Sequence, residues 1–259
     1  MSALTRFAGR HALVTGGAGS IGSATTRRLL AEGAQVTVWD RSAEALHALQ
    51  DGAECRKGQL RTRAVDLAQP DAIAQAAEVL ASDGSIDILV NNVGGAFDKP
   101  YSLLQQTDDD WQMTFNVNLM SAVRASRAVV TAMVKQRYGR IVNVGSKAGR
   151  YGSYIDGPSY VAAKGALHAL TMQLAMEFGH QGITANAVAP GMVLVERVRR
   201  LWETRRPAQE REAILNAIPL RRHATADDVA GVIVFLASDD AAFVTGAVID
   251  VNGGQSMQA

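Results

Sequence analysis

The sequence of 259 residues has little of several features that would mark a special class of protein. It contains one cysteine, Cys55, so no disulfide can form within the chain, which favours a reducing compartment. Its 26 lysines and arginines almost balance its 25 aspartates and glutamates, and the net charge of +1 does not favour nucleic acid as a partner. No apolar run approaches the roughly 18 residues of a membrane span, and the first residues contain no apolar signal core. We therefore expect a cytoplasmic protein whose partners are neither nucleic acid nor a membrane.

Internal repeats, low-complexity segments and linker-like stretches are also missing. The length fits one large domain with a sizeable core, so we predict a single domain over residues 1–259. Three consecutive aspartates, Asp108-Asp109-Asp110, follow Thr107, a good N-cap, and are expected to favour the dipole of a helix rather than to bind a metal. No metal site is predicted, and Cys55 is expected to have no chemical role.

A glycine-rich turn separates the first predicted strand from the first predicted helix. Residues 11–15 are an apolar run typical of a buried strand, and residues 24–32 form a helical pattern closed by Gly33. Glycines between them allow a tight turn and a close approach to a pyrophosphate, for which a helix N-terminus supplies N–H groups and partial positive charge. The residues predicted to bind phosphate in this turn are Gly16, Gly19, Ser20, Ile21 and Gly22.

The second predicted strand, residues 35–39, ends at Asp40. A carboxylate about 20 residues after such a turn accepts hydrogen bonds from the adenosine ribose and repels a 2′-phosphate. We therefore predict NAD rather than NADP as the cofactor. Arg41 keeps NADP open, because an arginine at this place can pair with a 2′-phosphate; a solvated or adenine-stacking arginine would not.

Strands and helices alternate along the rest of the chain. Further strands are predicted over 61–65, 86–90, 139–144, 183–188 and 247–251, and helices over 70–82, 108–134, 160–180 and 225–238. This alternation is typical of a doubly wound α/β protein with a parallel sheet. Ligands of such sheets lie beyond the carboxyl ends of the strands, where Asp40, Asp66 and Asn92 fall. Residues 147–158 are predicted to form a loop over this site.

Tyr160 and Lys164 are four residues apart in a run that favours helix, so their side chains share one face. A cation at about 4 Å in an effective dielectric of about 20 would favour the phenolate by roughly 4 kcal/mol. That would lower the pKa of a tyrosine from about 10 toward about 7, before desolvation raises it again. Such a tyrosine suits proton exchange with an alcohol. Taken alone, the pair is better explained by a tyrosine that packs on a lysine stem, and only the rest of the sequence favours the catalytic interpretation.

Two other segments have open interpretations. The helix predicted over 160–180 is apolar on nearly all faces, so one face is expected to need a partner such as another subunit. His168 on this helix is expected to pack rather than to act in catalysis. Residues 192–222 are rich in arginine and read either as a mobile lid that prefers anionic substrates or as a solvated amphipathic helix.

Over about residues 7–254 these motifs resemble, in order and spacing, the short-chain dehydrogenase/reductase family, and in particular its 3-oxoacyl-(acyl-carrier-protein) reductase-like members. The matching motifs are Thr15 to Gly22, Asp66, Asn91 to Gly94, Asn118, Ser146, Tyr160 with Lys164, Pro190-Gly191 and Asn252 to Gly254. The resemblance implies a Rossmann-type domain with a seven-stranded parallel sheet between two layers of helices. It also implies hydride transfer between a nicotinamide and an alcohol or carbonyl carbon, and a homotetramer.

The resemblance also implies roles for single residues. Tyr160 would be the general acid/base, and Lys164 would lower its pKa and hold the nicotinamide ribose. Ser146 would hydrogen-bond the substrate oxygen, and Asn118, rather than Asn116, would help to hold the lysine and a water in a proton relay. The cofactor contacts expected in total are Gly16, Gly19, Ser20, Ile21, Gly22, Asp40, Arg41, Asp66, Leu67, Asn92, Gly94, Tyr160, Lys164, Pro190 and Val193.

Four positions depart from the family pattern. Ser20 stands at the usual second glycine of the turn, and Val93 stands where alanine is usual. The spacing of 14 residues from Ser146 to Tyr160 is one longer than the commoner one. Val195 replaces a frequent threonine, which removes a hydroxyl that could contact the carboxamide.

The leading functional prediction is an NAD-dependent dehydrogenase that acts on a secondary alcohol or the matching ketone. An NADPH-dependent 3-oxoacyl-thioester reductase is the alternative within enzymes. Against it stand Asp40 and the neutral Thr131 and Met176, which align with basic carrier-binding positions of some such reductases. The arginine-rich segment 192–222 favours it. A non-catalytic dinucleotide-binding sensor is the alternative of another class.

Overall fold

The computed structural model describes residues 5–82, 84–96, 99–153, 156–195, 199, 202 and 207–257. Its sheet has seven strands in the order β3-β2-β1-β4-β5-β6-β7, and every neighbouring pair is parallel. The strands are β1 (His11–Thr15), β2 (Gln35–Asp40), β3 (Leu60–Ala64), β4 (Ile88–Asn91), β5 (Gly139–Val144), β6 (Ile183–Pro190) and β7 (Val248–Val251). The order reverses between β1 and β4, which is the switch point where doubly wound sheets bind ligands. The predicted seven-stranded parallel sheet is confirmed.

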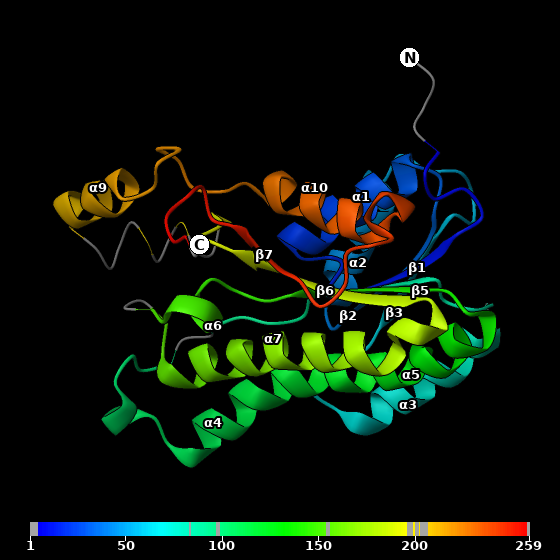
Figure 1. Cartoon of the computed structure of the whole chain (residues 1–259), viewed down its shortest axis with the longest axis horizontal. Coiled ribbons are helices and arrows are strands. Elements are labelled where there is room, and N and C mark those ends of the chain that lie inside the picture. The colour runs from blue at the N-terminus through cyan, green and yellow to red at the C-terminus, as the bar shows by residue number, and fades with distance from the viewer. Residues whose placement is uncertain are drawn as a thin grey trace.

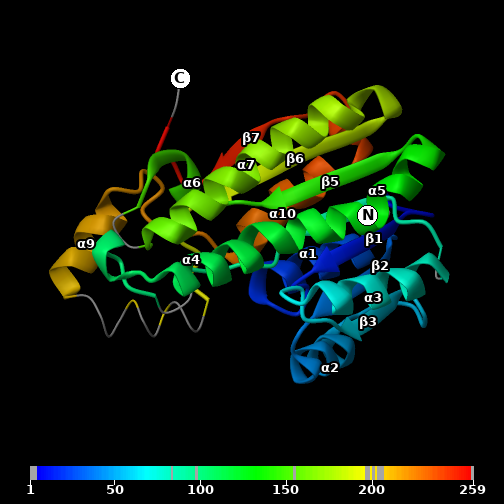
Figure 2. The same cartoon turned by 90° about the horizontal axis from the view of Figure 1, so that it is seen from below.

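Helices cover both faces of the sheet (Figures 1 and 2). One face carries α1 (Ser20–Ala31), α2 (Ala43–Gly52) and α10 (Ala226–Ala237). The other face carries α3 (Pro70–Ser82), α4 (Asp108–Phe115), α5 (Ser121–Gln136) and α7 (Pro158–Phe178). The predicted arrangement of three layers is therefore confirmed.

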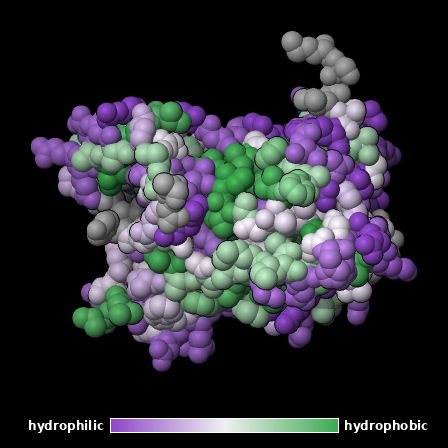
Figure 3. Space-filling model, viewed as in Figure 1, coloured by the Kyte–Doolittle hydropathy of each residue, from purple (hydrophilic) through white to green (hydrophobic). Residues whose placement is uncertain are grey.

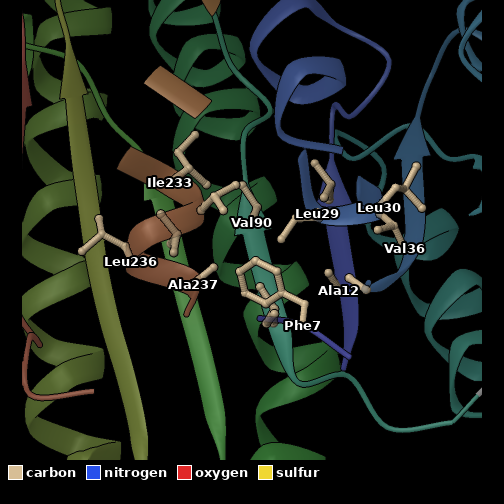
Figure 4. Packing of buried hydrophobic residues seen from close by; sticks show 14 of the residues in the cluster. Phe7, Ala12, Leu29, Leu30, Val36, Val90, Ile233, Leu236 and Ala237 are labelled. Atoms are coloured by element: carbon tan, nitrogen blue, oxygen red, sulfur yellow. The ribbon is translucent and has the colours of Figure 1, made fainter. Parts of the chain in front are cut away.

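The central strands are buried on both faces, which explains their unbroken apolar runs. Successive side chains of a strand point to opposite faces, so Ala12 and Val14 of β1 enter one hydrophobic cluster and Leu13 enters the other. Figure 4 shows the first cluster, where the ring of Phe7 lies between Ala12 of β1 and Ala237 of α10. Each large side chain buried in this way stabilises the fold by about 1.5–3 kcal/mol.

The helix predicted over 108–134 is interrupted, and this corrects the sequence interpretation. A π-helical turn, η2 (Asn116–Met120), separates α4 from α5. As predicted, Thr107 caps α4: its hydroxyl accepts from the N–H of Asp110, whose carboxylate accepts from the N–H of Thr107 in return. Asp110 also pairs with Lys99 at 2.7 Å, so it is a first-turn carboxylate with a cationic partner.

Other boundaries differ by a few residues. The loop predicted over 147–158 contains a short helix, α6 (Ala148–Tyr151), and the helix of Tyr160 begins at Pro158. The arginine-rich segment 192–222 lies partly outside the described residues; its described part includes α9 (Ala208–Asn216). The remaining short elements are η1 (Leu103–Gln105), η3 (Gly179–Gln181) and η4 (Asp239–Ala241).

The apolar helix α7 is covered on one side only. Leu167 and Leu174 are buried, whereas Met172 is 48% exposed and Met176 is 82% exposed. Figure 3 shows hydrophobic residues gathered over β7 and the adjoining part of α7 on the face in view. Within the described residues, no helix has the length and apolar character needed to cross a membrane.

Candidate active site

The loops that follow strands β1 to β6 enclose one cleft of about 950 Å³, within the range of small-molecule sites. Nearly all residues predicted to bind cofactor line it. They are Gly16, Gly19, Ser20, Ile21, Asp40, Arg41, Asp66, Leu67, Asn92, Gly94, Tyr160, Lys164, Pro190 and Val193. Ser146 lines it as well, whereas Gly22 and Asn118 lie behind its wall. Of these predicted residues, the two that lie farthest apart in the chain, Gly16 and Val193, are separated by 177 positions (193 − 16) and still converge on one edge of the sheet.

The glycine turn is as tight as its sequence suggests. A Cβ on Gly22 would overlap the carbonyl oxygen of Gly16 and lie 2.7 Å from the Cα of Gly17. A Cβ on Gly19 would meet only that carbonyl oxygen, at 3.3 Å. Gly19 is the N-cap of α1 and supplies no side chain to cap it, so the first N–H groups of the helix are open to the cleft. Ser20, which stands where the family pattern usually has its second glycine, also lines the cleft.

Asp40 is held at the end of β2 against the glycine turn. Its Oδ2 accepts a hydrogen bond from the N–H of Ala18 at 3.2 Å, and its Oδ1 accepts one from the N–H of Ser42 at 3.1 Å. These bonds orient the half-buried carboxylate, and each oxygen keeps a lone pair for a ligand. Arg41 beside it is exposed.

Asn92 joins the loop after β4 to the glycine turn. Its Nδ2 donates to the carbonyl oxygen of Gly16 at 2.9 Å, and its N–H donates to Oγ1 of Thr15 at 3.1 Å. Asn116 makes a similar link that sequence reasoning missed: its Nδ2 donates to the carbonyl oxygen of Ala68 at 2.9 Å, and its Oδ1 accepts from Arg124 at 2.7 Å. Asn116 thereby links the π-helical turn to the loop after β3. The only feature of the sequence that could have pointed to this role is an asparagine within a predicted helix, where asparagine is unfavourable.

Ser146 and Tyr160 both line the cleft, and the Ser146 hydroxyl lies near enough to the phenol to lower the pKa of Tyr160. Ser146 also accepts from the N–H of Ala148 at 3.1 Å, which fixes its side chain at the start of α6. Lys164 is 3% exposed, and its Nζ lies 5.8 Å from the centre of the Tyr160 ring. That Nζ donates to the carbonyl oxygen of Val144 at 2.8 Å. The predicted pair thus shares one helix face, with Ser146 opposite the phenol.

The electrostatics of Tyr160 differ from the sequence expectation. Burial and the negative charge of Asp156 raise the pKa of Tyr160 above its ordinary value, and the Ser146 hydroxyl only partly opposes them. Burial also lowers the pKa of Lys164 to about 8. The expected lowering of the tyrosine pKa toward neutrality is therefore wrong for this structure, because burial and the charge of Asp156 outweigh the groups that lower it.

Asn118 lies in the π-helical turn, fully buried behind the cleft wall. Its Nδ2 donates to the carbonyl oxygens of Thr114 at 3.0 Å and Gly95 at 3.1 Å, and its Oδ1 accepts from the N–H of Gly95 at 2.9 Å. A Cβ on Gly94 would lie 2.6 Å from this Oδ1 and 2.8 Å from Nζ of Lys164. Asn118 and Lys164 therefore both border the space beside the Cα of Gly94, where only glycine fits.

Other predicted residues are fixed at the rim or outside the cleft. The carbonyl oxygen of Pro190 accepts from the N–H of Lys147 at 3.0 Å, and Val193 pairs with Ala224 in a parallel bridge. His168 is 5% exposed and does not line the cleft; burial lowers its pKa to about 4, so it packs as a neutral ring, as expected. In the described part of the chain, no group of three or more His, Cys, Asp or Glu residues could hold a metal ion.

Comparison with known proteins extends these findings. Residues 16–256 match a family model described as enoyl-(acyl carrier protein) reductase. The chain is 38% identical over 250 residues to 3-oxoacyl-(acyl-carrier-protein) reductase FabG of Thermotoga maritima, which covers 96% of this chain and 98% of that protein. It is 38% identical over 264 residues to 2,3-dihydroxy-2,3-dihydro-p-cumate dehydrogenase of Pseudomonas putida. That alignment covers 99% of this chain and 100% of the other protein. The structure of an oxidoreductase of the short-chain dehydrogenase/reductase family from Burkholderia thailandensis matches with a TM-score of 0.83 at 35% identity, covering 95% of this chain and 92% of that one.

The parallel sheet and the cleft at its switch point define a Rossmann-type α/β protein. Together with the comparisons, they show that the chain belongs to the short-chain dehydrogenase/reductase family of oxidoreductases, which use a nicotinamide dinucleotide. The resemblance inferred from the ordered motifs is confirmed.

Proposed function

We propose that this chain transfers hydride between NAD(H) and a secondary alcohol or the matching ketone, with Tyr160 as general acid/base. The choice of NAD rests on the position of the Asp40 carboxylate. Its carboxylate is fixed by two backbone N–H groups at the edge of the cleft, at 3.2 and 3.1 Å, where an adenosine ribose would lie. A fixed negative charge favours two ribose hydroxyls and disfavours a 2′-phosphate.

The cleft fits a dinucleotide along its length. The open N-terminus of α1 at Gly19 suits the pyrophosphate, with Ser20, Ile21 and the turn supported by Gly22 around it. Asp66 and Leu67 would border the adenine, and Arg41 would stack on it or remain solvated. The nicotinamide half would be held by Asn92, Gly94, Tyr160, Lys164, Pro190 and Val193. A bound nicotinamide supplies the hydride acceptor or donor of the reaction.

The side chains that would move the proton lie in or beside the same cleft. The phenolic oxygen of Tyr160 would take the alcohol proton during oxidation and return it during reduction. Ser146 would donate a hydrogen bond where negative charge develops on the substrate oxygen. Lys164 would hold the ribose, and Asn118, which binds the backbone of Gly95, would help to hold the lysine and a water. The raised pKa of Tyr160 would fall when positive charge enters the cleft beside it.

The direction of the reaction and the assembly belong to the same proposal. One relative bears the name of a dehydrogenase of a cyclic dihydroxy compound, which supports alcohol oxidation. Another bears the name of a 3-oxoacyl reductase, which keeps reduction of a 3-oxoacyl thioester as the alternative. We also propose a cytoplasmic homotetramer, supported by the uncovered apolar side of α7 and by the single cysteine.

The test is cofactor titration followed by turnover of a panel of secondary alcohols, with Tyr160→Phe as the variant and Tyr138→Phe as its control. Tyr138 lies outside the cleft and hydrogen-bonds Asp239. We expect NAD to bind at least about tenfold more tightly than NADP. We also expect Tyr160→Phe to bind NAD normally and to lose about 10²–10⁴-fold in turnover. NADP preference would support the 3-oxoacyl-thioester reductase, and unchanged turnover by Tyr160→Phe would support a non-catalytic binding role.

A further inference from the structure

Lys147 is a cleft residue that neither the motifs nor the proposed reaction uses. It follows Ser146 directly, it is half-buried, and its side chain lines the cleft together with Asp156 and Tyr160. Its backbone is held on both sides. Its N–H donates to the carbonyl oxygen of Pro190 at 3.0 Å, and its carbonyl oxygen accepts from the N–H groups of Arg150 and Tyr151, both at 3.0 Å. The side chain therefore starts from a fixed point beside the reacting hydroxyls.

The ammonium of Lys147 has no hydrogen bond or ion pair with any described residue. The other cleft lysines do have partners: Lys99 binds Asp110 at 2.7 Å, and Lys164 binds the carbonyl oxygen of Val144 at 2.8 Å. Burial lowers the pKa of Lys147, and the negative charge of Asp156 opposes that shift. Asp156, a carboxylate of the same cleft, accepts a hydrogen bond from Oγ of Ser153 at 2.7 Å. Among the described residues, the charge of Asp156 therefore acts on Lys147 without a hydrogen bond between the two side chains. A half-buried ammonium that no acceptor solvates directly would be stabilised by a hydrogen-bonded anion in the cleft.

The phosphates of a dinucleotide are poorly placed to be that anion. They would lie at the N-terminus of α1 by Gly19, on the loop after β1, whereas Lys147 lies on the loop after β5 beside Ser146. Among the described cleft residues, this places Lys147 with the groups that face the substrate. A single ammonium suits a monoanion, since phosphate sites generally use arginine forks or several N–H groups.

We infer that Lys147 selects substrates that carry a carboxylate close to the reacting alcohol or ketone carbon. The inference rests on the proposed function for the place of the substrate, and it goes further by naming the substrate class. Ser146 and Tyr160 would hold the reacting oxygen, while Lys147, one residue along the same loop, would pair with the carboxylate. No covalent step is added, and Lys147 acts as a specificity-determining residue.

The experiment compares acids with their uncharged esters. The substrate pairs are 3-hydroxybutyrate with methyl 3-hydroxybutyrate and 3-hydroxycyclohexanecarboxylate with its methyl ester, each with NAD. The variants are Lys147→Met, which keeps the length of the stem, and Lys147→Arg, which keeps the charge. Lys135→Met is the matched control, because Lys135 is exposed at the end of α5 and does not line the cleft.

We expect the unaltered protein to prefer the acids in kcat/KM. In Lys147→Met the preference should fall about 10–100-fold, through KM for the acids, while the esters stay unchanged. Lys147→Arg should keep most of the preference, and Lys135→Met all of it. Equal losses for acids and esters, or a preference of the unaltered protein for esters, would overturn the inference.

A binding measurement separates this inference from the proposed reaction. Benzoate and benzamide are titrated into the protein without cofactor, and binding is followed by ligand-observed NMR, with 3-hydroxybutyrate as competitor. We expect benzoate to bind to the unaltered protein and to Lys147→Arg, and to lose binding in Lys147→Met. If benzoate depends on Lys147 but no alcohol reduces NAD, the carboxylate site stands and the proposed reaction is wrong. No benzoate binding, or equal binding by Lys147→Met, contradicts the carboxylate site whatever the reaction.

Discussion

The ammonium of Lys164 lies 5.8 Å from the centre of the Tyr160 ring and hydrogen-bonds the carbonyl oxygen of Val144 at 2.8 Å. The lysine is thus tied to the end of β5 rather than to the phenol. Because it is almost fully buried, the unpaired part of its charge is poorly solvated, and its pKa falls to about 8. Burial therefore favours the uncharged form of both residues: it raises the pKa of Tyr160 and lowers that of Lys164. Because the pKa of Lys164 differs between the folded and the unfolded chain, the free energy of unfolding depends on pH.

Replacement of Lys164 by Met should remove a pH dependence of stability. The folded pKa of about 8 is lower than the ordinary value of 10.5, so between these pH values the unfolded chain binds the proton that the folded chain has released. The free energy of unfolding of the unaltered protein should therefore rise relative to Lys164→Met, by at most about 1.4 kcal/mol per pH unit. Well below pH 8, where the lysine is protonated in the folded and the unfolded chain, the difference should be constant. Urea unfolding at pH 7, 8, 9 and 9.5 measures this difference in the free energy of unfolding, with Lys135→Met as the control. A difference that does not change up to pH 9.5 would contradict the lowered pKa of the buried ammonium.

Two glycine substitutions in the same turn should have different effects. In Gly22→Ala the new methyl group meets the backbone of Gly16 and Gly17, so thermal unfolding should show a loss of about 2–4 kcal/mol. In Gly19→Ala the methyl group has room, so stability should change by less than about 1 kcal/mol. Gly19 nevertheless stands at the open N-terminus of α1, so the added methyl group should weaken NAD binding at least about tenfold. Normal NAD binding by Gly19→Ala would argue against the pyrophosphate site.

Replacement of Asp40 by Ser should move the cofactor preference toward NADP. The change removes the negative charge at the ribose position and leaves Arg41 free to pair with a 2′-phosphate. We expect the ratio of kcat/KM for NAD to that for NADP to fall by about 10–100-fold. Asp51→Ser, on an exposed residue of α2, is the control and should leave the ratio unchanged. If Asp40→Ser keeps the ratio, another group selects the cofactor.

Charges on the uncovered side of α7 should dissociate the proposed homotetramer. Met172 and Met176 present apolar surface there, and the double substitution Met172→Glu/Met176→Glu would bury unpaired carboxylates in any interface on that side. Sedimentation velocity should show a tetramer for the unaltered protein and smaller species for the variant. Leu104→Glu, on η1 at a residue that is 94% exposed, is the matched control. A monomer of the unaltered protein would contradict the tetramer.

Much of this molecule could be predicted because its signals are local. Strands that are buried on both faces read as apolar runs, and the glycine turn follows one of them directly. Tyr160 and Lys164 share a face because a helix repeats every 3.6 residues. The carboxyl ends of parallel strands meet at one edge, so Asp40, Asp66 and Asn92 could be placed together before any contact was known.

The sequence by itself therefore determined the order of the elements, the parallel sheet and the identity of the side chains at its carboxyl edge. Only the tertiary structure decided the break of the long helix at the π-helical turn, where Asn116 reaches Ala68 across 48 residues of chain. It also decided the raised pKa of Tyr160 and the half-buried position of Lys147 beside Ser146. The physical reason is that desolvation and long-range contacts depend on what distant segments place around a group, whereas periodicity, turns and caps depend only on its neighbours in the chain.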